Sequence, residues 1–130
     1  MQSKKAQLSI EFSFIAGILL ASFVIFMLIV QENLSEETRD RKMMEMKEVA
    51  NIVKNEIDLA HSSIEGYRRE FKLPSQVYGS DYDVRINESI VFVIIPGEKY
   101  QLSMAIQDVT GDLNKTLNVI TKENGTVKLN

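Results

Sequence analysis

Glu11 is the first candidate for chemistry in this 130-residue chain, because its carboxylate stands at the start of a long apolar run. It belongs to the stretch QLSIE, where Gln7, Ser9 and Glu11 alternate with apolar residues just after the basic pair Lys4 and Lys5. An unpaired carboxylate near lipid costs about 2–3 kcal/mol, and such a residue usually has a partner or a function. Two interpretations stay open: Glu11 pairs with a cation, or it reaches the polar headgroup region from the end of its helix.

The other polar residues form no catalytic constellation. The chain has no cysteine and a single histidine, His61, which argues against thiolate metal sites, cysteine nucleophiles and most zinc or triad chemistry. We interpret His61 as a surface residue. The acidic pairs Glu36–Glu37 and Asp81/Asp83 fit a solvated surface better than a catalytic dyad or a calcium loop. We therefore expect no enzyme, metal or cofactor, and the balance of 15 basic against 18 acidic residues predicts no nucleic-acid partner.

Residues 12–30 form an uninterrupted apolar segment, FSFIAGILLASFVIFMLIV, in which only Ser13 and Ser22 are polar. As a helix it is about 28 Å long, close to the thickness of the hydrocarbon core of a bilayer. A cleavable secretory signal has a shorter apolar region followed by small residues, whereas QEN follows here, so we expect the segment to be retained. The two preceding lysines favour a cytoplasmic N-terminus and an exported remainder. Gly17 is interpreted as a glycine that membrane helices tolerate.

The helix is expected to continue beyond the membrane, because residues 31–64 contain no proline or glycine. Apolar residues recur there in steps of three and four, as one stripe on a helix: Met43, Met46, Val49, Val53, Ile57, Ala60, Ile64 and Tyr67. This pattern predicts a single helix from about Leu8 to about Tyr67. Its first half is apolar and its second half is amphipathic.

After Gln76 the pattern changes to a period of two, which predicts an antiparallel sheet of four or five strands. Residues 90–95, IVFVII, indicate its central and most buried strand. Two further strands show alternating apolar residues: Tyr82, Val84 and Ile86, then Tyr100, Leu102, Met104 and Ile106. Asn124–Gly125 favours a tight hairpin that sets Ile120 opposite Leu129. Because the sheet and the helical stripe each need an apolar partner, we predict an α+β fold, one long N-terminal helix packed on a small antiparallel sheet.

Four Asn-x-Ser/Thr sequons follow the apolar segment, at Asn33, Asn87, Asn114 and Asn124. Each is a candidate for N-glycosylation on the exported side of the membrane. Asn124 is the least suitable of the four, because it occupies the tight turn.

The order of these features resembles the archaeal class III signal peptide of type IV pilin-like proteins. The resemblance rests on a leader, Met1–Ala6, with Lys4 and Lys5, then on Gln7, Ser9 and Glu11 as Gln-x-Ser-x-Glu, then on the apolar helix. The motif covers about the first thirty residues, and the plan of a long helix with a sheet extends the likeness less specifically to the whole chain. Ile15 stands where the family often has leucine and keeps an apolar side chain there. Ala6 stands where many relatives have glycine and keeps a small residue there.

The resemblance implies that an aspartyl prepilin peptidase in the membrane cuts between Ala6 and Gln7 and leaves the apolar helix attached. Loss of Lys4 and Lys5 then leaves 13 basic against 18 acidic residues, a formal charge of −5. The expected segments are a cleaved leader (1–6), an apolar membrane or filament-core helix (7–30), its amphipathic continuation (31–70) and a sheet (74–130).

The resemblance also implies that an assembly ATPase and a platform membrane protein move subunits from the membrane into a homo-oligomeric helical filament at the cell surface, where it serves adhesion. In related filaments the glutamate at this place meets the N-terminal amine of a neighbouring subunit, which here is that of Gln7. The residues expected in subunit assembly are Glu11, Phe12, Phe14, Ile15, Ile18 and Leu19. Two alternatives share the signal: a minor pilin that primes assembly, and a monomeric membrane-anchored extracellular binding domain.

Overall fold

The computed structural model describes residues 2–99 and 101–130, with side chains for residues 8–99 and 101–130. Within these residues the elements are one helix and six strands: α1 (Gln2–Ser62), β1 (Arg68–Lys72), β2 (Asp83–Asn87), β3 (Ile90–Ile94), β4 (Gln101–Ala105), β5 (Leu117–Glu123) and β6 (Thr126–Leu129). The chain divides into two compact units, an N-terminal unit that ends at Arg39 and a C-terminal unit, Asp40–Asn130. The predicted class is confirmed: a long N-terminal helix packs on antiparallel strands in an α+β fold.

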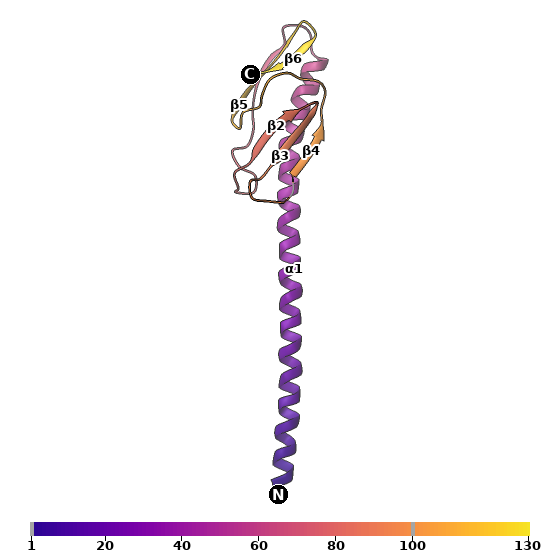
Figure 1. The fold of residues 1–130 in the computed structure, drawn as a ribbon, viewed down its shortest axis with the longest axis vertical. Coiled ribbons are helices and arrows are strands. Elements are labelled where there is room, and N and C mark those ends of the chain that lie inside the picture. The colour runs from indigo at the N-terminus through magenta and orange to yellow at the C-terminus, as the bar shows by residue number, and fades with distance from the viewer. Residues whose placement is uncertain (1, 100) are drawn as a thin grey trace. The chain divides into compact units, whose positions relative to one another are not determined.

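The strands form two small antiparallel sheets, where the sequence pattern predicted one sheet of four or five strands. One sheet has the order β2-β3-β4 and the other the order β1-β5-β6. Figure 1 shows both beside the part of α1 that belongs to the C-terminal unit. The sheets are separate because β5 pairs with β1 and β6 rather than with β4, so no ladder joins the two sets of strands.

The amphipathic half of α1 supplies one side of the core, as its spacing predicts. Its buried positions are Met46, Val49, Ala50, Val53, Ile57 and Ala60. The strands and loops add buried side chains to the same cluster, among them Tyr82, Val91, Val93, Ile120, Val127 and Leu129. Each layer thus covers the apolar face that the other would leave in water.

The helix ends at Ser62, about one turn before the predicted end, and Ile64 of the predicted stripe is 85% exposed. Lys122 of β5 caps this end of the helix, since its ammonium donates to the main-chain oxygens of His61 at 2.7 Å and Ser63 at 2.8 Å. The last carbonyls of a helix have no partner within it, and a cation at this end is favoured by the helix dipole. A residue 59 positions beyond Ser63 therefore helps to stabilise the end of the helix.

Strand β1 replaces the last part of the predicted helical segment 31–70, so the sheet region begins before residue 74. It pairs antiparallel with β5, and Arg68 lies opposite Thr121. Gly66 precedes it with a φ of 82°, a conformation that suits glycine in a turn. Phe71 is the one buried residue of β1, so the strand carries no apolar alternation for a sequence pattern to detect.

Strand β3 is the central strand of its sheet, as predicted, but its burial alternates. Val91 and Val93 are fully buried, whereas Ile90 is 36% exposed. The unbroken apolar run therefore does not mark a strand buried on both faces. In β4 the predicted alternation holds for Leu102 and Met104, which pack against the core, while Tyr100 lies outside the described residues.

The β5–β6 hairpin agrees with the prediction residue by residue. Asn124 and Gly125 have φ of 51° and 75°, as a tight turn of this kind requires. Ile120 lies directly opposite Leu129, and both are buried. Local turn chemistry was enough to predict this register.

Asp58 connects α1 to the segment after β4 through hydrogen bonds, and we expect this contact to be sensitive to acid. Lys54 donates to its carboxylate, and Gln107 Nε2 donates to Asp58 Oδ1 at 2.9 Å. The hydrogen bond from Lys54, with a smaller one from Gln107, lowers the pKa of Asp58 below the ordinary value of 3.8. Since the folded pKa is the lower one, the stabilisation is complete above pH 3.8 and is lost as the pH falls through the folded pKa.

We expect the thermal midpoint of the wild-type chain to fall more steeply with acid than that of Asp58→Asn, which has no charge to lose. Circular dichroism melts between about pH 2 and pH 6 measure the difference. An equal dependence of the thermal midpoint on pH in the two chains would show that the charge of Asp58 does not contribute to stability.

Candidate functional site

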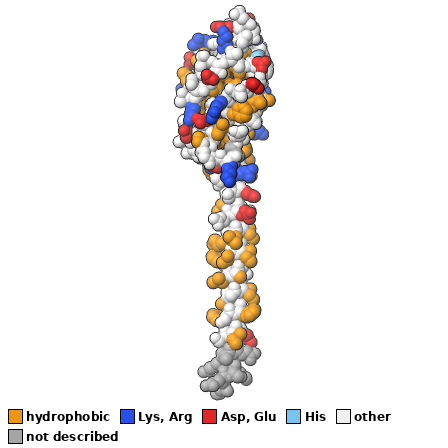
Figure 2. All heavy atoms as spheres, in the orientation of Figure 1, with side chains coloured by type: hydrophobic (Ala, Val, Ile, Leu, Met, Phe, Trp, Pro, Cys, Tyr) orange, Lys and Arg blue, Asp and Glu red, His pale blue; other side chains and the backbone are white. Residues whose placement is uncertain are grey.

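The apolar half of α1 is the candidate site, because its side chains are exposed. All residues from 8 to 29 are exposed, and their large apolar side chains are between 48% and 74% accessible. On the face shown in Figure 2, hydrophobic side chains run along this segment. The helix is long and apolar enough to cross a membrane. An apolar surface of this extent marks a contact with lipid or with other protein.

The two serines of the apolar segment satisfy their hydroxyls within the helix. Ser13 Oγ donates to the main-chain oxygen of Ser9 at 2.9 Å, and Ser22 Oγ donates to that of Ile18 at 2.8 Å. An unsatisfied hydroxyl is costly in an apolar medium, so these bonds let the helix carry serine there. The bond at Ser9 uses its main chain, and nothing in the structure explains a serine side chain at that position.

The predicted assembly residues lie on two adjoining faces of α1 rather than on one. Helical spacing places Glu11 on one face with the residues three, four and seven positions later: Phe14, Ile15 and Ile18. Phe12 and Leu19, seven residues apart, share the neighbouring face, and Ile15 borders both. All of these side chains are exposed, and Glu11 also takes part in an interaction within the chain.

An open groove of about 310 Å³ runs beside the Glu11 face, lined by Ser13, Phe14, Gly17, Ile18 and Ala21. Its small residues recur at every fourth position, an arrangement that lets another helix approach closely. A Cβ at Gly17 would meet no atom within 4 Å, so the chain alone gives no reason for glycine there. The spacing Ser13-Gly17-Ala21 is visible in the sequence, and the interpretation of Gly17 as a tolerated glycine stays a prediction.

A second hollow, of about 550 Å³, lies where the end of α1 meets the β2–β3 turn, the β5–β6 hairpin and the segment after β4. His61, expected at the surface, is half-buried here, and its Nε2 lies 2.7 Å from the main-chain oxygen of Asp108. Ser89 donates its hydroxyl to the Asp108 carboxylate. These polar groups hold the segment after β4 in place, and the described residues contain no group of three His, Cys, Asp or Glu side chains arranged to hold a metal.

The acidic pair Asp81/Asp83 converges on Lys115, whose Nζ lies 2.8 Å from Asp81 Oδ1 and 3.5 Å from Asp83 Oδ1. The hydrogen bond from Lys115 lowers the pKa of Asp81, so this carboxyl is held in its charged form. The arrangement joins Lys115, in the loop before β5, to Asp81 in the loop before β2 and to Asp83 at the start of β2.

All four sequon asparagines are exposed: Asn33 on α1, Asn87 at the end of β2, Asn114 before β5 and Asn124 in the hairpin turn. The backbone at Asn114 is fixed by Asn118, a buried residue that donates to its oxygen at 2.8 Å and accepts from its nitrogen at 2.7 Å. The side chains of Asn33, Asn87 and Asn114 are accessible for modification.

The predicted processing residues Lys4, Lys5, Ala6 and Gln7 lie outside the side chains that the structure describes. Comparison of the chain with protein-family models, with curated proteins and with solved structures finds no match.

Proposed function

We propose that this chain is a pilin, a structural subunit of an archaeal type IV pilus-like surface filament. The observation that carries the proposal is the fully exposed apolar half of α1 with Glu11 near its start. Such a surface needs cover on every side, which the bilayer supplies before assembly and neighbouring copies supply in a filament. The C-terminal unit has a hydrophobic core of its own and needs no such cover.

The proposed sequence of events begins with insertion into the cell membrane, N-terminus in the cytoplasm. A prepilin peptidase then cuts between Ala6 and Gln7. An assembly ATPase and a platform membrane protein transfer the subunit into a helical filament, whose surface serves adhesion. The chain itself performs no catalysis in this scheme and binds no cofactor.

Electron microscopy of purified surface filaments, with N-terminal sequencing of their subunit, tests the proposal. We expect filaments built from this chain, with Gln7 as the first residue. A few copies per filament would indicate a minor, priming subunit. Uncut chain in the membrane and no filament would support a monomeric anchored domain and contradict the proposal. The intact mass of the same subunit shows whether the sequons carry glycans.

Gly17→Ala tests the groove. The added methyl group meets no atom of the chain, and alanine favours a helix over glycine by about 1 kcal/mol, so the subunit should be at least as helical as the wild type. Filament yield should nevertheless fall, because the methyl group keeps a neighbouring helix at a distance. Ser103→Thr adds one methyl group at an exposed residue of β4, outside the apolar segment, and is the control. Unchanged yield for Gly17→Ala would contradict a close helix contact at this groove.

A further inference from the structure

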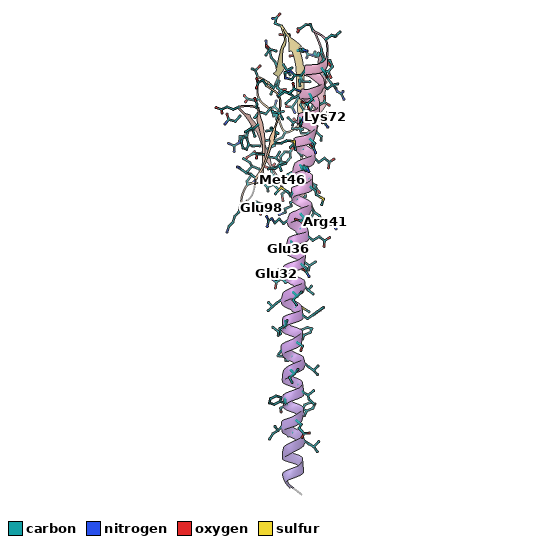
Figure 3. The ribbon with its side chains drawn as sticks, turned by 90° about the vertical axis from the view of Figure 1, so that its right-hand side faces the viewer. Glu32, Glu36, Arg41, Met46, Lys72 and Glu98 are labelled. Atoms are coloured by element: carbon teal, nitrogen blue, oxygen red, sulfur yellow. The ribbon has the colours of Figure 1, made fainter. Side chains whose placement is uncertain are left out.

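We propose that neighbouring copies of this chain contact one another through two oppositely charged bands on α1, an inference that rests on the filament function proposed above. The acidic band is Glu32 and Glu36, which share one face of α1, and the basic band is Arg39 and Arg41, which lie on opposite sides of the helix. All four side chains are exposed, and Figure 3 shows Glu32, Glu36 and Arg41 projecting from the helix. The bands follow directly on the apolar segment that is proposed to bundle.

The acidic band carries charge that its own helix does not neutralise. Glu32 and Glu36 are four residues apart, so they share a face and repel each other. No lysine or arginine lies within four residues of Glu32 on either side, the range over which helical side chains meet. Glu36 has Arg39 three residues later but Asp40 four residues later. A cation from outside the chain would relieve this repulsion.

The basic band lies one to two turns further along α1. Residues 39–42 hold three cations and one carboxylate, that of Asp40. Lys42 forms an ion pair with Glu98, with 2.6 Å between Lys42 Nζ and Glu98 Oε1. The exposed cations of this stretch are Arg39 and Arg41. Both arginines also interact within the chain. Exposed ion pairs are weak and exchange partners, and a guanidinium has five donors, so such contacts do not exclude a second carboxylate.

The order of the charges selects a second copy of the chain as the partner. Two parallel copies in register would set acid against acid and base against base. A copy displaced by about six residues, about 9 Å along a helix, sets the acidic band of one copy beside one of the two arginines of the next. The first copy then still offers its basic band, and the second its acidic band, to further copies. A contact of this heterologous kind does not close on itself and continues as a helical filament.

Two charge-reversed chains, E32K/E36K and R39E/R41E, test the contact. Each chain alone is expected to reach the membrane and be processed, with a loss of filaments of roughly tenfold or more, because like charges then face each other. Co-expression of the two chains is expected to restore filaments. One chain carries cations in both bands and the other carries carboxylates in both, so an alternating filament pairs every band.

If the mixture forms filaments again, the charged contact lies between copies rather than within one helix, because each chain still carries its own reversed charges. Glu70→Lys with Asp112→Lys makes the same change of net charge as E32K/E36K, and Lys72→Glu with Arg85→Glu makes the same change as R39E/R41E. All four residues are exposed in the C-terminal unit, so both control chains should assemble normally. Circular dichroism of each purified chain in detergent establishes that it is folded.

The proposal is wrong if either reversed chain alone gives wild-type filaments, or if the two folded chains together give none. In the second case, binding of the wild-type chain but not R39E/R41E to vesicles of anionic lipid would identify headgroups as the partner of the arginines. If the wild-type chain itself forms no filaments, the filament function fails, independently of these bands.

Discussion

Glu11→Ala is expected to give a chain that enters the membrane and is processed but forms no filaments. In the proposed function, cleavage before Gln7 would create an N-terminal ammonium group whose pKa is near 8, so that it is charged at neutral pH. This ammonium would need a partner between packed apolar helices, and we propose that the Glu11 carboxylate of a neighbouring copy is that partner. Removing one member of a buried ion pair costs about 3–5 kcal/mol, because the other charge stays buried and unpaired.

Counts of filaments by electron microscopy, with sequencing of the membrane-bound chain, measure this effect. Glu48→Ala is the matched control, since Glu48 is an exposed glutamate of the same helix outside the apolar segment. Normal filaments from Glu11→Ala would contradict the assembly role. They would favour the other interpretation, in which Glu11 only reaches the headgroup region.

The chemical state of Gln7 decides which form of the contact applies. An N-terminal glutamine can cyclise and so lose its amine, which removes the positive partner of Glu11. Mass spectrometry of the filament subunit distinguishes the two forms by the mass of ammonia. Mostly cyclised Gln7 would mean that a neutral hydrogen bond, rather than an ion pair, meets the carboxylate.

The parts of the fold that follow local rules could be predicted from the sequence. The buried stripe from Met46 to Ala60 follows helical spacing, and the β5–β6 hairpin follows the turn chemistry of Asn124–Gly125. The end of α1 and the strand β1 could not be predicted, because Lys122 and the pairing with β5 fix them from far along the chain. The β2–β3 turn is another such case, since Glu88 and Ser89 take positive φ without being glycine or asparagine.

The candidate site divides in the same way. The position of Glu11 before the apolar run is visible in the sequence, whereas its predicted role in assembly comes from the resemblance of the first thirty residues. The sequence could not show that the whole circumference of residues 8–29 is exposed, because a buried core helix has a similar composition. The contact of His61 with Asp108 could not be predicted from the sequence either, since it joins residues 47 positions apart.

Gly111→Ala is expected to destabilise the C-terminal unit by more than about 3 kcal/mol, the largest effect of any single methyl group considered in this chain. Gly111 has a φ of 104°, and a Cβ there would lie 2.0 Å from the main-chain oxygen of Leu129. The loop cannot move aside easily. Leu129 donates its N–H to the oxygen of Thr110 at 2.7 Å, and Thr110 donates its own to the oxygen of Val127 at 3.1 Å.

Gly97→Ala separates the two causes of this loss. Gly97 also has a positive φ, of 88°, but a Cβ there would meet no atom within 4 Å, so its substitution costs only the backbone strain of about 1–2 kcal/mol. Urea unfolding of both full-length variants in detergent, followed by near-ultraviolet circular dichroism of the buried Tyr82, gives the two free energies. Equal losses would show that the strand β6 yields to the methyl group. A much larger loss for Gly111→Ala would show that the close approach of Leu129 requires glycine, and that the segment after β4 is held by β6 rather than by its own conformation.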